Sequence, residues 1–267
     1  MTSAQSDPAS AEQRIVQHFP PGASTSTPMN LDYRIGKLVA AGLLKGRWLD
    51  YGSAEGDYTF ALVAKGADTA VGFDVIEARV CAAREKFRSD PRVTFHFDAS
   101  GAVPEPDQSF DGVFINEVME HVTDEGATLT EVNRLLRPGG HIVVISPNRW
   151  FPFECHGAMV GERKLDFPVP FLPWLPERLG QRYMLARNYW PSELGDLVAR
   201  YGFEIEPLQF VWPVLEAYPW MPSGMIGPYQ RLVPKLDRMP LIGRFGVSTL
   251  VIGRKVRDAG GKSSRTS

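Results

Sequence analysis

Cysteine is scarce in this chain of 267 residues: Cys81 and Cys155 are the only two, and they form no C-x-x-C pair. A disulfide framework or a structural zinc site is therefore not expected, and the composition fits a reducing cytosol. The sequence also lacks any run of about 18 apolar residues, the length that a membrane-spanning helix needs. Residues 1–10 are polar and contain no apolar core of a signal peptide. We therefore expect a cytoplasmic location, with attachment to a membrane surface left open.

The chain also lacks a large excess of charge of either sign. Lys and Arg number 29 and Asp and Glu number 31, which gives a formal net charge of −2. Without a global basic field, nucleic acid is not an expected partner. Hydrophobic residues make up 43% of the chain, which suffices for a large core.

The most informative feature that is present is a turn of small residues behind a short apolar strand. Gly52, Ala54 and Gly56 recur at every second position, after residues 47–51 and before a predicted helix at residues 57–65. At such a turn a ligand can pack directly on the backbone, and the helix N-terminus presents free N–H groups. The sequence therefore predicts a nucleotide site, with a tight strand–helix turn as the purely structural alternative.

Between residues 47 and 148, predicted strands and helices alternate. The expected strands cover residues 47–51, 70–74, 93–98, 110–116 and 141–146. The expected helices cover residues 57–65, 76–87 and 124–136, and Pro138-Gly139-Gly140 is expected to end the last of them. Apolar strands linked by helices are typical of a parallel sheet that is covered on both faces. The predicted fold class is therefore α/β, with a Rossmann-like doubly wound sheet.

After residue 147 the pattern changes. Residues 148–189 are rich in Pro, Phe and Trp, so we expect a lid or substrate wall there, without regular strands. A helix is expected at 191–201, a strand at 203–212, a second apolar insertion at 213–243 and a closing strand at 246–256. The predicted organisation is a polar tail (1–30), a single domain (31–256) and a disordered tail (257–267). Within the domain we expect a nucleotide-binding core at 47–148 and cap insertions at about 149–190 and 213–245.

The side chain at position 57 bears on which nucleotide the turn holds. A dinucleotide fingerprint needs a small neutral residue there, and the carboxylate of Asp57 would repel a pyrophosphate. S-adenosylmethionine (SAM) instead carries a sulfonium and an ammonium group, which the carboxylates of Asp50 and Asp57 tolerate. Asp74 and Asp98 each end a predicted strand, so they are predicted to accept hydrogen bonds from the ribose and the adenine amino group. A helix cap at Asp74 and a turn at Asp98 are the structural alternatives.

Several motifs together carry a family resemblance. The motifs are Leu49-Asp50-x-Gly52-x-Ala54-x-Gly56, Gly72-Phe73-Asp74, Phe97-Asp98-Ala99, Phe110-Asp111-Gly112-Val113-Phe114-Ile115-Asn116-Glu117-Val118-x-Glu120-His121 and Leu135-Leu136-Arg137-Pro138-Gly139-Gly140. Over residues 40–148 the chain resembles the class I SAM-dependent methyltransferases, in the small-molecule branch often called methyltransferase type 11. The resemblance implies a seven-stranded sheet whose last strand is antiparallel. Ala54 departs from the commoner middle glycine of the turn.

The resemblance also implies where SAM binds. It implies that the turn contacts the methionine part, that Asp74 contacts the ribose, and that residues 98–99 contact the adenine. Residues 116–118 are implied to lie beside the sulfonium. The complete predicted set of cofactor contacts is Asp50, Gly52, Ser53, Ala54, Gly56, Tyr58, Asp74, Val75, Asp98, Ala99, Asn116, Glu117 and Val118.

Two histidines are candidates for a general base. His121 follows the predicted strand tip near the expected methyl donor, and histidine titrates near neutral pH. The alternative for His121 is a packing or hydrogen-bonding role. His156 lies in a segment that leaves the fifth strand at the active-site edge, where a base, an acid and aromatic rings occur together. The predicted substrate contacts in that segment are Asn148, Arg149, Trp150 and Glu154, with a loop of buried aromatic rings as the alternative.

The predicted activity is methyl transfer from SAM to a small-molecule acceptor, and analogy favours a hydroxyl of a sugar, a glycolipid or a secondary metabolite. A non-catalytic SAM- or nucleotide-binding module and an NAD-dependent oxidoreductase are the alternatives. No metal-ligand set is recognised, so no metal is predicted. Residues 213–257 contain seven basic and two acidic residues beside aromatic ones. That composition is compatible with contact with an anionic bilayer or a lipid-linked substrate. The alternatives for this region are a cap over the pocket and a dimer face.

Overall fold

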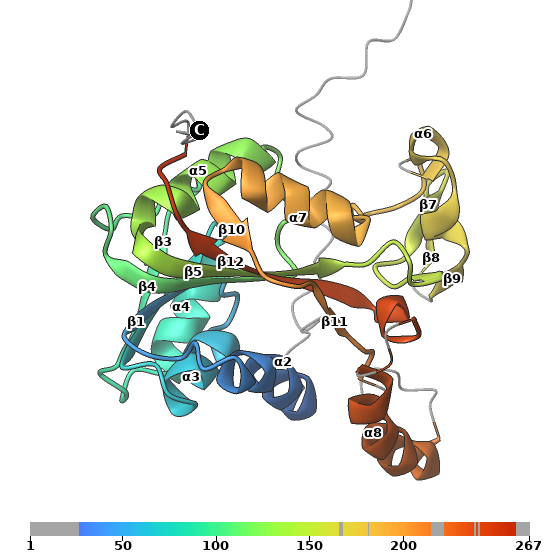
Figure 1. Cartoon of the computed structure of the whole chain (residues 1–267), viewed down its shortest axis with the longest axis horizontal. Coiled ribbons are helices and arrows are strands. Elements are labelled where there is room, and N and C mark those ends of the chain that lie inside the picture. The colour runs from blue at the N-terminus through green and yellow to red at the C-terminus, as the bar shows by residue number, and fades with distance from the viewer. Residues whose placement is uncertain are drawn as a thin grey trace, which may run out of the picture.

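A sheet with helices on both faces forms the body of the protein (Figure 1). The computed structural model describes residues 27–165, 168–180, 182–214, 222–237, 239 and 241–259. The strands follow the spatial order β10-β12-β5-β4-β1-β2-β3, and β11 also pairs with β12. Their bounds are β1 Arg47–Tyr51, β2 Thr69–Asp74, β3 Val93–Phe97, β4 Phe110–Asn116, β5 Leu136–Pro147, β10 Phe203–Ile205, β11 Gln209–Val211 and β12 Ser248–Lys255.

Two helical layers cover the sheet, and each closes its own apolar core (Figure 1). The lower layer holds α2 Pro28–Ala40, α3 Asp57–Ala64 and α4 Glu77–Lys86, and the upper layer holds α5 Glu125–Leu135 and α7 Pro191–Arg200. Neighbouring residues of a strand point to opposite faces. Accordingly Leu49 packs in the core with α5 and α7, whereas Trp48 packs in the core with α2, α3 and α4. The predicted doubly wound α/β fold is confirmed.

The order of the strands fixes where a ligand is expected. β1 pairs in parallel with β2 on one side and with β4 on the other. The chain runs outward through β1, β2 and β3 and then returns to the other side of β1 as β4. Open α/β sheets bind their ligands at the carboxyl ends of the strands where the order reverses in this way. The turn after β1 and the residues after β4 both lie at that point.

The strands and helices predicted for residues 47–148 are present, and their ends differ by a few residues at most, apart from the start of β5. The closing strand β12 is antiparallel to β5, as the resemblance implies. The prediction that residues 138–140 separate a helix from a strand was wrong, because β5 begins at Leu136 and contains them. The register against β4 moves there from Phe110 opposite Leu136 to Gly112 opposite His141. The extra residues therefore form an irregularity inside the strand, like a bulge.

Residues 148–190, which we call the cap, contain short strands where none were expected. β6 Phe153–Glu154 pairs with β9 Val169–Pro170, and β7 Ala158–Val160 pairs with β8 Arg163–Leu165. The turn η1 Leu172–Trp174 and the helix α6 Glu177–Gly180 complete the described part of the cap. Strands of two or three residues are too short to produce a recognisable alternation in the sequence.

The second half of the chain differs from the prediction in two further places. The strand expected at 203–212 is divided into β10 and β11, because Pro207 between them has no N–H for the sheet ladder. Part of the second insertion forms the helix α8 Ser223–Asp237, followed by the turn η3 Gly243–Phe245. None of the helices in the described ranges has the length and apolar character needed to cross a bilayer.

The predicted tails overlap the folded part at both ends. α2 begins at Pro28, inside the range predicted as a polar tail. At the other end, the backbone of Arg257 and Ala259 bonds to the side chain of Asn133. Residues 1–26, 215–221 and 260–267 lie outside the described residues, and with them most of both predicted tails.

Candidate active site

The predicted nucleotide turn is held against the end of β2 and the tip of β4. The N–H groups of Gly52 and Ser53 both donate to the carbonyl of Phe73, at 2.8 and 2.9 Å. Gly52 has a φ of +85°, and a Cβ there would lie 2.3 Å from the side chain of Val118. A side chain at position 52 would therefore strain the backbone and also collide with the residues that follow β4.

Asp74 fixes the shape of this turn. Its Oδ2 accepts a hydrogen bond from the N–H of Ala54 at 2.9 Å, and its Oδ1 accepts one from the N–H of Ile76 at 2.9 Å. Ala54 has a φ of +46°, so the carboxylate stabilises a left-handed conformation that alanine seldom adopts. Burial raises the pKa of Asp74, and the two hydrogen bonds oppose that rise. Each oxygen keeps a lone pair for a ribose hydroxyl, so the predicted ribose contact is sterically and chemically consistent and stays a prediction.

The other two strand-end carboxylates differ in their surroundings. Asp50 is only 2% exposed and accepts a hydrogen bond from Thr59 Oγ1 at 2.7 Å. Burial raises the pKa of Asp50 to about 7, helped by the charge of Asp74 and opposed by the Thr59 bond. Asp98 accepts bonds from the N–H and the Oγ of Ser100, and these bonds lower its pKa. The predicted turn role of Asp98 is thus present, and its contact with adenine stays a prediction.

The residues around the turn fit a bound nucleotide. The Oγ of Ser53 is buried and has no hydrogen-bond partner among the described residues. A ligand atom would satisfy it, since buried hydroxyl groups normally have a partner. Val75, at the end of β2, is exposed, as is Ala99 after β3. Tyr58 is instead buried in the lower core, where its ring packs on Phe114 with centroids 5.6 Å apart.

A residue that the sequence did not single out organises the tip of β4. Arg34 of α2 is buried, and its Nη1 donates to Asn116 Oδ1 at 2.5 Å and to Glu117 Oε1 at 2.8 Å. Ser248 of β12 donates to the same Glu117 oxygen at 2.6 Å. Burial alone would raise the pKa of Glu117, but the charges of Arg34 and His156 and the hydrogen bonds with Glu120 and Ser248 together outweigh it and lower the pKa. The predicted sulfonium side of the cofactor site is therefore positioned by α2.

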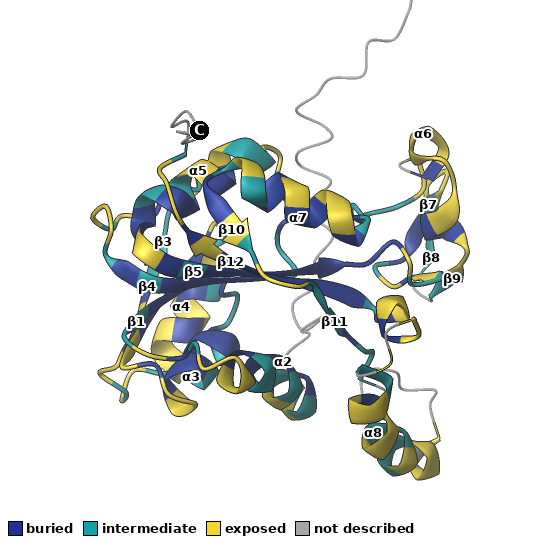
Figure 2. Cartoon of the chain, viewed as in Figure 1, coloured by how far each residue is buried: buried dark blue, intermediate teal, exposed yellow. Residues whose placement is uncertain are grey.

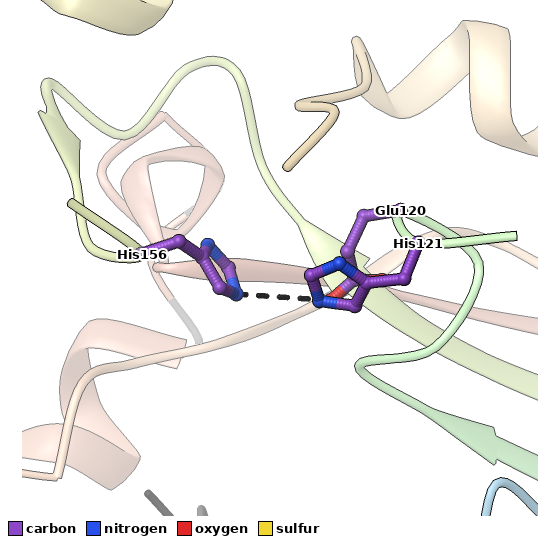
Figure 3. Close-up of side chains that lie close together, drawn as sticks. All are labelled: Glu120, His121 and His156. Carbon is purple, nitrogen blue, oxygen red and sulfur yellow. Dashed lines mark ion pairs between the residues drawn. The ribbon is translucent and has the colours of Figure 1, made fainter. Parts of the chain in front are cut away.

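The two histidines predicted as bases are brought together, although they are 35 positions apart in sequence, and the side chain of Glu120 lies close to them (Figure 3). The rings of His121 and His156 meet edge to face with centroids 5.6 Å apart. Glu120 Oε1 lies 3.9 Å from the Nε2 of each histidine. We call Glu120, His121 and His156 the polar cluster. Glu120 and His121 lie in the turn that follows the tip of β4, where the N–H of His121 donates to the carbonyl of Val118 at 2.9 Å. His156 reaches them from the cap.

Burial makes the members of the polar cluster differ in their protonation. Burial and the charge of Glu117 raise the pKa of Glu120 well above its usual range. Burial, with the charge of His156, lowers the pKa of His121 to about 3, so His121 is neutral at pH 7. Burial alone would lower the pKa of His156, but its bond to Glu154 and the charge of that carboxylate raise it.

Glu154 serves this cluster from the cap. Its side chain is completely buried, and its Oε1 accepts from the backbone N–H of His156 at 2.9 Å and lies 3.2 Å from His156 Nδ1. Asn188 donates to the other oxygen at 2.5 Å. Glu154, predicted as a substrate contact, is therefore placed to orient His156, and direct contact with a substrate stays a prediction.

The other predicted substrate residues make contacts within the protein. Asn148 Nδ2 donates to the carbonyls of Arg244 and Gly246, at 2.7 Å each. Arg149 donates to the carbonyls of Pro173 and Leu175, which are part of the cap. The ring of Trp150 is partly exposed and meets those of Trp190 and Phe245 edge to face. Asn148 thus joins the start of the cap to the turn η3, and Arg149 joins two parts of the cap. Substrate binding by these three residues stays a prediction.

A cavity of about 280 Å³ lies next to the cap. Residues from α5, the cap and α7 line it, among them Glu125, Arg187, Asn188 and Glu193. It shares Asn188 with the network around His156. Tyr189 forms part of the wall and donates to Glu125 Oε1 at 2.6 Å.

Comparison with known proteins identifies the family to which this fold belongs. A family model described as a methyltransferase domain matches residues 45–167. A protein of Mycolicibacterium smegmatis named "Probable S-adenosylmethionine-dependent methyltransferase" is 38% identical over 158 residues, which cover 59% of this chain and 52% of the relative. A ubiquinone biosynthesis O-methyltransferase of Dinoroseobacter shibae is 32% identical over 188 residues, which cover 66% of this chain and 71% of the relative. The chain spans about half the length of several other curated relatives that it matches, for example 41% and 60% in two of them.

The fold itself is that of solved methyltransferases. A SAM-dependent methyltransferase from Mesorhizobium loti superposes with a TM-score of 0.57 at 21% identity, over 84% of this chain and all of the other. The fold and the turn after β1 are those of an α/β protein of the Rossmann-like, nucleotide-binding type. More narrowly, this chain belongs to the SAM-dependent methyltransferases, and SAM is the cofactor of that family. This membership removes the NAD-dependent oxidoreductase from the alternatives.

Proposed function

We propose that this protein transfers the methyl group of SAM to a hydroxyl oxygen of a small acceptor. The observation that carries this proposal is the position of the polar cluster, directly after the strand tip beside which the family binds the sulfonium. A hydroxyl nucleophile must lose its proton, and groups that exchange protons or stabilise an alkoxide are useful next to the methyl donor. Buried titratable groups at such a place are more typical of a functional site than of a structural one.

In the proposed reaction the acceptor oxygen attacks the methyl carbon in line with the carbon–sulfur bond. The oxygen–carbon bond forms as the carbon–sulfur bond breaks, and the electron pair of that bond stays on sulfur to give S-adenosylhomocysteine. Within the polar cluster the hydroxyl proton passes to the neutral form of His156, whose pKa is raised whereas that of His121 is lowered, and from there to water. Because the sulfonium is already activated, the protein mainly aligns the reactants, excludes water and accepts the proton.

We infer the class of acceptor from the name of one relative and from the exposed surface of α8. The relative from Dinoroseobacter shibae is named an O-methyltransferase, which favours oxygen over nitrogen as the acceptor atom. α8 exposes Met225 and Leu232 beside the basic residues Arg231 and Lys235. Apolar and basic side chains on one helix suit an anionic lipid surface. A hydroxyl on a glycolipid, on another lipid-linked molecule or on an apolar secondary metabolite is therefore the favoured acceptor.

Calorimetric titration of the full chain with SAM, S-adenosylhomocysteine and NAD is the first test. We expect binding of the first two only, and Asp74→Ala should weaken SAM binding at least tenfold, or about 1.4 kcal/mol, because the turn loses its anchor and the ribose its acceptor. Asp107→Ala, which removes an exposed carboxylate paired with Arg134, is the matched control and should bind SAM as the wild type does.

Methyl transfer is then tested by screening hydroxylated glycans, lipids and phenols with methyl-labelled SAM. SAM binding without labelling of any acceptor would favour the remaining alternative, a non-catalytic SAM-binding module. Unchanged SAM affinity in Asp74→Ala would instead overturn the assignment of the cofactor site.

A further inference from the structure

The polar cluster has the donor atoms of a metal site. Glu120, His121 and His156 each offer one ligand atom, and these atoms lie within 4.8 Å of one another. The two measured separations, from Glu120 Oε1 to each histidine Nε2, are 3.9 Å. Donors around a tetrahedral ion with bonds of about 2.1 Å lie about 3.4 Å apart. The two Glu120 separations exceed this value by about 0.5 Å, and the pair of histidine donors, which lies within 4.8 Å, exceeds it by about 1.4 Å at most. Side-chain movements of this size would therefore bring the three atoms to bonding distance.

Neighbouring groups hold two of the donors in the orientation that a metal needs. Glu154 accepts from His156 Nδ1, so the lone pair of a neutral His156 lies on Nε2, which faces Glu120. A carboxylate behind a histidine ligand is the usual support of such a site. Ser146 donates to Glu120 Oε2 at 3.0 Å, and Glu120 Oε1, the oxygen that faces the histidines, has no hydrogen-bond partner among the described residues.

The ion pairs around the cluster leave room for a cation. Glu120 is buried, and the side chain of Glu117 is only 11% exposed. Arg34 forms an ion pair with Glu117, whereas within the described residues no Lys or Arg forms an ion pair with Glu120. Buried carboxylates are usually paired with a cation or coordinate a metal.

We propose that Glu120, His121 and His156 bind a divalent transition-metal ion such as Zn²⁺ or Mn²⁺. Two imidazoles and one carboxylate suit such ions better than Mg²⁺ or Ca²⁺. Three protein ligands leave at least one position open, as catalytic metal sites do. If the proposed function holds, the acceptor hydroxyl occupies that open position. The ion would lower the pKa of the hydroxyl, so that the hydroxyl loses a proton to water before the oxygen attacks the methyl carbon. The polar cluster then acts through the ion. This proposal departs from the expectation of no metal drawn from the sequence, which the structure does not test.

Metal binding is testable without any acceptor. The full chain, stripped with a chelator, is titrated with Co²⁺, which reports coordination by its visible absorption, and with Zn²⁺ in competition. We expect one ion per chain, an affinity at least tenfold lower in Glu120→Gln and in His156→Ala, and about tenfold lower in Glu154→Gln, where only the support of His156 is lost. His96→Ala, which changes a half-exposed histidine of β3, is the control and should bind as the wild type does. SAM binding by each variant shows that it is folded.

The pH and the acceptor provide separate readouts. A proton on His156 competes with the metal for the same lone pair, so affinity should fall as the pH drops from 8 to 6. Equal Co²⁺ affinity in the wild type and His156→Ala, or no binding at all, would overturn the site. Metal binding without methylation of any acceptor supports the site and counts against the proposed function. Methylation that continues unchanged in the chelator-stripped protein overturns the role of the ion and leaves the polar cluster as a general base.

Discussion

The central sheet buries its large apolar side chains, whereas the helix α8 exposes several of its own (Figure 2). Trp48, Phe73 and Phe114 in the sheet are fully buried between the two helical layers. In α8, Met225 is 56% exposed and Leu232 is 46% exposed. The sheet therefore completes its own core, whereas α8 buries Val233 and leaves Met225 and Leu232 exposed.

Glycines show the same contrast. A Cβ on Gly112 of β4 would lie 2.4 Å from the ring of Trp48, so the sheet has no room for even one methyl group there. A Cβ on Gly224 of α8 would meet nothing within 4 Å. α8 is joined to α2 at its last residue, where Asp237 accepts from Tyr33 and Lys37. Close packing thus fixes the positions of the strands in the sheet, whereas polar contacts at its last residue hold α8 against α2.

Adding one methyl group in each region measures this contrast directly. Gly112→Ala should lower the free energy of unfolding by about 3 kcal/mol, because the new Cβ overlaps a buried indole that cannot move away. Gly224→Ala should raise it by up to about 1 kcal/mol, because alanine favours a helix more than glycine does. Urea unfolding at 25 °C checks both values, and equal effects would contradict the contrast in packing.

The sequence predicted the close-packed region well for the same reason. From β1 to β5, apolar segments of strand length alternate with helices, and small residues such as Gly52 stand where the backbone needs them. The cofactor turn could be located because its geometry depends on residues next to one another in the chain. The histidines of the polar cluster were both singled out, but their meeting across 35 positions depends on the path of the cap.

What the sequence did not predict depends on long-range contacts or on very short elements. Arg34 acts on Asn116 and Glu117 from 82 and 83 positions away. Only the helix that carries it had a local signal, with Thr27 as the N-cap and Pro28 in the first turn. The paired strands of the cap have two or three residues each. Glu154 and His156 were each singled out, but the contact between them was not predicted.

Buried charge in the sheet lowers stability, unlike the exposed charges of Arg231 and Lys235 on α8. Asp50 has a pKa of about 7 in the folded protein against an ordinary value of 3.8. Between these values the folded state binds more protons than the unfolded state, so Asp50 lowers stability as the pH rises from about 4 to 7. Asp50→Asn removes this loss and should raise the free energy of unfolding at pH 8 by roughly 1–3 kcal/mol.

Urea unfolding of Asp50→Asn at pH 5 and pH 8 checks that sign: the gain over wild type should be larger at pH 8. SAM binding should weaken in the same variant, because the neutral amide no longer attracts the positive charges of the cofactor. A gain that is equal at the two pH values would show that the burial of Asp50 does not alter its titration. Thr59→Val, which removes the hydrogen bond to Asp50, should move the stability in the opposite direction at pH 8.

The smallest effect on stability is expected on the exposed face of α8. Leu232→Ser should change the free energy of unfolding by less than about 0.5 kcal/mol, since the side chain has little apolar contact to lose.

If this face contacts a membrane, the same substitution should weaken co-sedimentation with anionic phosphatidylserine vesicles several-fold, and Lys235→Ala should weaken it in a salt-dependent way. Arg254→Ala, which changes a basic residue of β12, serves as the control for charge alone. Wild-type protein that binds neither anionic nor neutral vesicles would contradict the membrane contact, and a dimer seen by sedimentation that Leu232→Ser abolishes would assign the face to a second copy of the chain.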